Sequence, residues 1–154
     1  MTHRPLSALI AALLTVCASS AAAQVTAEQR VLREVVTVTE DGERVVTEAP
    51  AAMVAPGDRV IYRLSYRNEG TAPATGLKLV MPVPKDIAFV PGSAEGPGAV
   101  SYSVDGEAYG ALDALSLPDG RAATPGDVRA LRWTLAEPLA PGGRGEIAYK
   151  GVLR

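Results

Sequence analysis

Strict two-residue alternation in residues 59–67 is the feature that most constrains the fold of this chain. Apolar side chains occupy every second position, and the positions between them carry three arginines, an isoleucine and a serine. A period of two is typical of a half-buried β-strand and does not fit a helix. Turn residues at 56–58 (Pro-Gly-Asp) and 68–70 (Asn-Glu-Gly) bound the strand. We predict inward side chains at Val60, Tyr62, Leu64 and Tyr66, and outward ones at Arg59, Ile61, Arg63, Ser65 and Arg67.

Short extended segments separated by Gly, Pro and Asp recur along the rest of the chain. Residues 31–39 and 44–47 flank an Asp-Gly pair, which predicts a β-hairpin. Residues 26–34 also fit one helical turn. We predict a short edge strand at residues 51–54, between two prolines that cannot donate to a central ladder. The remaining predicted strands lie at residues 77–81, 87–90, 100–104, 130–135 and 145–153.

The spacing of these segments sets the fold class. Turn signals separate the short strands every 8 to 15 residues or so, which is typical of an antiparallel β-sandwich. We therefore predict an all-β sandwich of about seven to nine strands, preceded by a signal peptide. The asparagine that ends the central strand, Asn68, is expected to cap a turn through its side chain.

Residues 1–23 have the composition of a cleavable signal peptide. A short basic region at His3 and Arg4 precedes an apolar run from residue 6 to 17, and alanines at 21–23 provide a cleavage site before Gln24. The apolar run is too short to cross ~30 Å of hydrocarbon as a helix. We therefore expect an exported protein, periplasmic or secreted, with no stable membrane insertion after cleavage.

Cleavage after residue 23 would remove the only histidine, His3, and the only cysteine, Cys17. Lipidation of Cys17 is an alternative, although Val16 stands where a small residue is expected. A chain without histidine and cysteine cannot form a Ser-His-Asp site or a thiolate metal centre. We therefore expect no enzyme activity, cofactor or metal. The cleaved chain loses one of 15 basic and none of 17 acidic residues, and its net charge of −3 does not favour nucleic acid.

Five segments resemble a known bacterial domain. They are APGDRVIYRLSYRNEGTAPATGLKLVMPVP, FVPGSA, YSVDG, DVRALRW and PLAPGGRGEIAY. Together they resemble the DUF11, or conserved repeat, domain of bacterial surface proteins over residues 54–152. The resemblance implies an immunoglobulin-like sandwich in exported envelope proteins, with no known catalytic site. The predicted organisation is a signal peptide (1–23), an N-terminal β-hairpin segment (24–50) and a DUF11-like sandwich (51–154).

The outward arginines of the central strand are the candidate partner surface. If Arg59, Arg63 and Arg67 all face solvent, their guanidinium groups could bind an acidic polymer or the carboxylates of a partner protein. The alternative is cross-strand pairing with acidic residues of neighbouring strands, which we favour.

Two other groups of residues have alternative interpretations. Five aspartates in turns could supply oxygens to calcium, or could simply stabilise the turns. Trp133 is in phase with Leu131 and Leu135, which predicts a core position rather than an exposed stacking platform for sugar. The turn aspartates are Asp41, Asp58, Asp105, Asp119 and Asp127.

Two functions fit this sequence. The first is a non-catalytic structural or interaction module of the bacterial cell envelope, which binds another envelope or surface protein through sheet edges or loops. The alternative is a periplasmic chaperone-like protein that acts by β-strand addition. Prolines at 50, 56, 82, 84 and 91 are typical of edge protection and argue against the alternative.

Overall fold

The computed structural model describes residues 22–154, so most of the predicted signal peptide, residues 1–21, lies outside the described residues. The described part is all-β, with eight strands and two short 3-10 helices. This number of strands agrees with the predicted seven to nine. The strands are β1 (Val25–Val38), β2 (Arg44–Pro50), β3 (Arg59–Asn68), β4 (Lys78–Pro82), β5 (Ile87–Phe89), β6 (Ala99–Ser103), β7 (Ala130–Thr134) and β8 (Arg144–Leu153), and the helices are η1 (Leu112–Ala114) and η2 (Pro125–Asp127).

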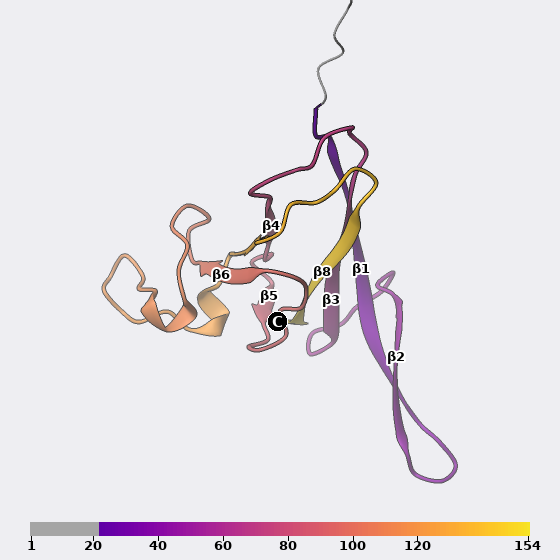
Figure 1. Cartoon of the computed structure of the whole chain (residues 1–154). Helices are drawn as coiled ribbons and strands as arrows, with labels where there is room; N and C mark the ends of the chain where they lie inside the picture. Colours follow the sequence, from indigo (N-terminus) through magenta and orange to yellow (C-terminus); the bar gives the residue numbers. More distant parts are fainter. Residues whose placement is uncertain (1–21) are drawn as a thin grey trace, which may run out of the picture.

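The strands form two antiparallel sheets in a sandwich-like arrangement (Figure 1). One sheet has the order β2-β1-β3-β8-β5, and the other has the order β4-β7-β6. The segment predicted as an N-terminal hairpin, residues 24–50, supplies β1 and β2 to the five-stranded sheet. Within residues 22–154, no helix is both long and apolar enough to cross a bilayer.

The core lies between the two sheets. Trp133 and Leu131 of β7 are fully buried, which confirms the core position predicted for the tryptophan. The rings of Tyr62 on β3 and Tyr149 on β8 stack with their centroids 4.9 Å apart. The Tyr149 hydroxyl donates a hydrogen bond of 2.7 Å to the carbonyl of Pro82 at the end of β4. Apolar packing and one buried polar contact therefore join the two sheets.

The alternation predicted for β3 is confirmed. Val60 and Tyr66 are buried, and Arg59 and Arg67 are exposed. Ile61 is an exception, because it belongs to the outward set and yet is only 2% exposed. Something on the outer face of the sheet must therefore cover it.

The Asn68 side chain forms hydrogen bonds with three segments at one end of the sandwich. Asn68 is fully buried, and its Oδ1 accepts hydrogen bonds from the backbone N–H groups of Gln24 and Gly70. Its Nδ2 donates to the carbonyls of Ala72 and Leu139. The hydrogen bond from Gly70 confirms the predicted turn cap. A buried amide that makes all four of its hydrogen bonds is a stable polar contact in a dry site.

The helical turn considered for residues 26–34 is wrong, because β1 begins at Val25 and continues without interruption to Val38. The first nine residues of β1 pair with β3, from Val25 opposite Asn68 to Arg33 opposite Val60. This tertiary pairing overrides the weak local signal of the polar residues 26–30.

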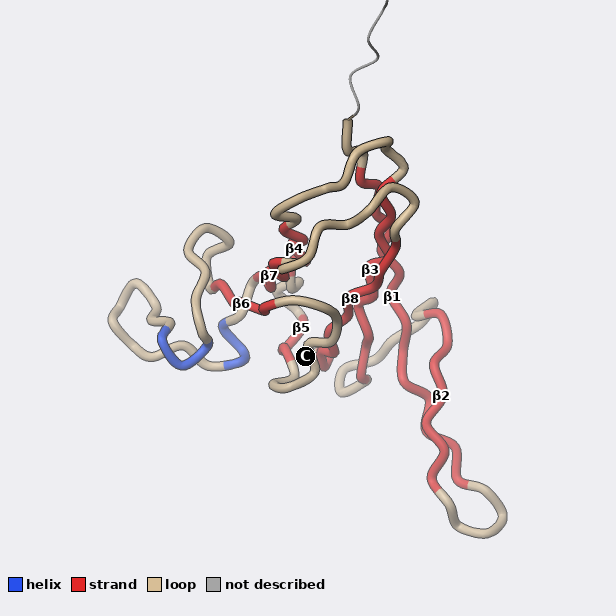
Figure 2. The backbone as a smooth tube through the Cα atoms, viewed as in Figure 1, coloured by secondary structure: helices blue, strands red, loops and turns tan. Residues whose placement is uncertain are grey.

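The edge strand predicted at residues 51–54 is also wrong, because these residues form a loop. β2 and β3 lie on opposite edges of β1. The chain between them must therefore cross β1, as the tube in Figure 2 shows, and it cannot pair as a strand on the way.

Two adjacent residues of β4 provide a test of the core. Met81 is fully buried and its neighbour Val80 is 47% exposed. We expect Met81→Ala to lower the free energy of unfolding by about 2–5 kcal/mol through loss of burial and a cavity. Val80→Ala should change it by less than about 0.5 kcal/mol. Urea denaturation followed by the fluorescence of Trp133 measures both values, and equal losses would contradict the assignment of the two faces.

Candidate interaction surface

A network of ion pairs crosses the outer face of the five-stranded sheet. Arg63 on β3 donates hydrogen bonds of 2.7 and 3.0 Å to the two carboxylate oxygens of Glu48 on β2. The Nε of Arg63 lies 3.1 Å from Oε1 of Glu146 on β8. Lys150 on β8 extends its Nζ to within 2.6 Å of Oε1 of Glu34 on β1. The cross-strand pairing considered for the arginine row is therefore observed at Arg63.

This network also explains the burial of Ile61. In the β3–β8 register, Lys150 lies opposite Ile61 and Arg63 lies opposite Ala148. Because the Lys150 side chain reaches from β8 to Glu34 on β1, it must pass over β3 where Ile61 lies. Its aliphatic stem therefore lies over the side of the sheet that carries Ile61. This agrees with the exposure of Ile61, which is only 2%.

The two acidic members on β1 and β2 would repel each other without their cations. Glu34 and Glu48 are directly opposite in the register of β1 and β2. Like charges at such positions are destabilising. The hydrogen bond from Arg63 lowers the pKa of Glu48, and the same contact raises the pKa of Arg63. The network thus places a cation beside each of the two carboxylates.

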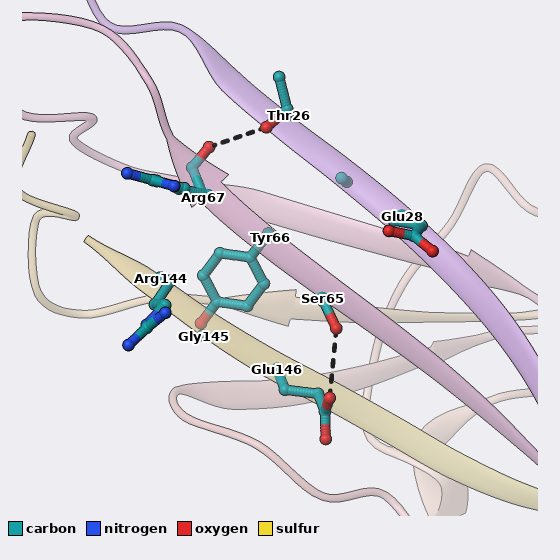
Figure 3. Close-up of a pocket in the computed structure, with 9 residues that line it drawn as sticks. Thr26, Glu28, Ser65, Tyr66, Arg67, Arg144, Gly145 and Glu146 are labelled. Carbon is teal, nitrogen blue, oxygen red and sulfur yellow. Dashed lines mark hydrogen bonds between the residues drawn. The ribbon is translucent and has the colours of Figure 1, made fainter. Parts of the chain in front are cut away.

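The other two arginines of the predicted row lie apart from this network. Arg59 and Arg67 are exposed and form no ion pair within residues 22–154. Arg67 instead lies directly opposite Arg144, the first residue of β8, which is also exposed. Figure 3 shows both side chains beside a shallow groove and directed to the same side of it, while Glu146 lies further along the sheet. Of the three arginines, only Arg63 therefore belongs to the ion-pair network.

The last five residues of β1 and most of β2 extend beyond the sandwich as a two-stranded ribbon (Figure 1). We call residues 34–48 the β1–β2 ribbon. Past Arg33, β1 has no partner other than β2 within residues 22–154. The exposed fractions are high for four of the ribbon's five valines, Val35 being the exception. They are 46% for Val36, 61% for Val38 and 56% for Val46 on the outer face, and 38% for Val45 on the other.

Exposed apolar residues on an isolated ribbon indicate a binding surface. A two-stranded hairpin is marginally stable on its own, because it buries little apolar surface. Contiguous exposed apolar residues mark sites of protein interaction. The outer edge of β2 is also open, since β2 is the last strand of its sheet and pairs only with β1 in the described part of the chain.

Four of the five turn aspartates stabilise their own loops. Oδ1 of Asp105 accepts hydrogen bonds from the hydroxyl of Ser103 and from the backbone N–H groups of Glu107 and Ala108. These contacts lower the pKa of Asp105. Across residues 22–154, no three acidic, histidine or cysteine side chains come together in a way that could hold a metal ion. Local hydrogen bonds to backbone N–H groups are made by Asp58, Asp105, Asp119 and Asp127.

The hairpin predicted around the Asp-Gly pair is confirmed by the pairing of β1 with β2. Sequence reasoning missed that this ribbon extends beyond the sandwich and that Arg67 lies opposite Arg144. The ribbon had a signal: valines stand next to each other at 35–36 and at 45–46, which places apolar side chains on both faces of each strand. No signal in the sequence indicated that Arg67 and Arg144 are opposite each other, because the register between β3 and β8 joins residues far apart in the sequence.

No family model, curated protein or solved structure matches this chain. Any assignment of function therefore rests on the residues and their geometry.

The Glu48–Arg63 contact predicts a pH-dependent stability. We expect Glu48→Gln to lower the free energy of unfolding at pH 7 by no more than about 1 kcal/mol, because both side chains are partly exposed. Since the folded state lowers the pKa of Glu48, this contribution is present above the ordinary glutamate pKa of about 4.3. It disappears as the pH falls through the lowered value.

Urea denaturation of both chains at pH 7 and at about pH 2 tests this expectation, and the two stabilities should converge at the lower pH. Glu40→Gln, in the turn of the ribbon, is the control, because Glu40 forms no ion pair in the described part of the chain. A difference that persists unchanged at low pH would show that the loss at Glu48 is not electrostatic.

Proposed function

We propose that this chain is a non-catalytic interaction module of the bacterial cell envelope, exported to the periplasm or beyond. It binds another envelope or surface protein through the β1–β2 ribbon. The observation that carries this proposal is the ribbon itself, with exposed valines on both faces and an open edge outside the sandwich. The signal-like composition of residues 1–23 and the resemblance to the DUF11 domain support export and an immunoglobulin-like topology.

The energetics of the ribbon favour a bound state. Burying a valine side chain contributes roughly 1.5 kcal/mol or more relative to leaving it in water. Val36, Val38 and Val46 share one face of the ribbon and are each about half exposed or more. A partner that covered this face would recover roughly half of that contribution from each of the three residues, because each is already partly buried.

The ion-pair network prepares the ribbon for binding. Arg63 holds Glu48 of β2, and Lys150 holds Glu34 of β1. Both contacts join the base of the ribbon to strands of the sandwich, so they restrict its direction. A pre-oriented element loses less conformational freedom when it binds.

One observation favours the alternative, a periplasmic chaperone-like protein that acts by β-strand addition. β2 leaves its outer edge unpaired in the described structure, as strand addition requires. However, β2 has seven residues, carries Arg44 and Glu48, and ends at Pro50, which has no N–H group. A short, charged edge is less suited to many unfolded clients than to one defined strand.

A ribbon-face variant tests the proposed function. We expect the tagged full chain to retain one stoichiometric partner from an envelope extract, and Val36→Lys/Val38→Lys to retain at least about tenfold less, because two charges would have to be buried. Val80→Lys is the matched control, since Val80 is a similarly exposed valine on β4. Quantitative mass spectrometry of the bound proteins gives the ratio.

The outcomes separate the two functions. Many unfolded proteins at low stoichiometry would support the chaperone-like alternative. A partner that binds the ribbon variant as well as the natural chain would exclude the ribbon as the binding element. Far-UV circular dichroism of all three chains checks that each one folds.

A further inference from the structure

The backbone of β2 presents a defined set of hydrogen-bonding groups at its free edge. The N–H of Thr39 donates to the carbonyl of Glu43 at 2.9 Å, so Glu43 directs its backbone groups toward β1. Backbone direction alternates along a strand. The backbone groups of Arg44, Val46 and Glu48 therefore point away from β1, toward the open edge.

The side chains along this edge of β2 are complementary to those of a second, antiparallel copy of β2. If two copies of β2 lie antiparallel with Val46 opposite Val46, Arg44 of each copy lies opposite Glu48 of the other. Opposite charges and apolar pairs at such positions stabilise a sheet. The outward backbone groups of the three residues also meet their counterparts, which gives about six N–H···O=C hydrogen bonds between the copies.

Neighbouring registers are less favourable. A shift of two residues in one direction places Arg44 opposite Pro50, which has no N–H to donate. A shift of two residues in the other direction places Arg44 opposite Val46 and removes both pairings between opposite charges. Among the three registers that align outward backbone groups near the centre of β2, the one centred on Val46 therefore satisfies charge, packing and hydrogen bonding together.

We propose that a second copy of this chain occupies the free edge of β2, in the antiparallel register centred on Val46. The proposal rests on the ribbon as the interaction element of the proposed function, and it names the occupant of the ribbon's edge. Joining the two five-stranded sheets gives a dimer with one continuous ten-stranded sheet and a twofold axis through the Val46 pair.

The dimer also enlarges the surface left for an envelope partner. A twofold axis perpendicular to the sheet keeps the two outer faces on the same side. Val36, Val38 and Val46 of both copies then form one apolar patch on that side. Glu48 can keep its contact with Arg63 within its own copy, because a carboxylate has about four acceptor positions and can also receive the Arg44 of the other copy.

A charge exchange tests the register. Sedimentation equilibrium of the full chain should show a concentration-dependent dimer. Arg44→Glu places two pairs of glutamates across the axis, and Glu48→Lys places two pairs of cations there. We expect each variant alone to raise the dimer dissociation constant at least about tenfold. An equimolar mixture of the two variants should recover the dimer, because every acidic side chain at positions 44 and 48 then faces a basic one.

A cysteine at the axis gives a second test that does not depend on charge. Directly opposite residues in a hydrogen-bonded antiparallel pair have Cα atoms about 5.5 Å apart, within the range of a disulfide. In a Cys17→Ser chain, Val46→Cys should form a covalent dimer under mild oxidation. The control, Val80→Cys, introduces a similarly exposed thiol on β4 and should form at least about tenfold less covalent dimer.

The results distinguish this proposal from the proposed function. A chain that stays monomeric at every concentration, or a dimer that Arg44→Glu leaves unchanged, would overturn the dimer. If such a monomer still lost its envelope partner on Val36→Lys/Val38→Lys, the interaction module would stand and only the occupant of the β2 edge would be wrong. Recovery in the mixture and a disulfide in the Val46→Cys chain would support the dimer even if no envelope partner were retained.

Discussion

The arrangement of the five-stranded sheet depends on the length of β1. This strand has 14 residues, and β3 pairs with only the first nine of them, up to Arg33. The remaining residues need another partner for their backbone groups, and β2 provides it from the opposite edge. The ribbon therefore extends beyond the sandwich, and the chain after Pro50 crosses β1. The outer edge of β2 has no partner strand in the described structure.

The outer face shows how a sheet can be covered without a second layer. The three-stranded sheet packs on one face, and on the other the stem of Lys150 crosses β3 where Ile61 lies. Lys150 and Arg63 also neutralise glutamates on β1 and β2. Packing and charge are thus combined in a few long side chains, and the contacts that cover the sheet also fix the direction of the ribbon.

Features that depend on the local residue pattern could be predicted from the sequence. Features that depend on pairing between distant strands could not. Alternation predicted the two faces of β3 and the burial of Trp133, because side-chain direction has a period of two in any strand. It did not predict that β1 begins at Val25, since residues 26–30 are polar and extended only through their pairing with β3. The opposition of Arg67 and Arg144 likewise depends on a register between distant strands.

The contacts of Asn68 have a consequence for the order of folding. Its hydrogen bond with Gln24 spans 44 positions of the sequence, and its hydrogen bond with Leu139 spans 71. Contacts between such distant residues require closure of long loops and form slowly. The start of β1 can be held once Asn68 has joined the sheet, but the Asn68 amide completes its four hydrogen bonds only when the segment around Leu139 is in place. This end of the sandwich is therefore completed only after residues near the C-terminal part of the chain have joined the fold.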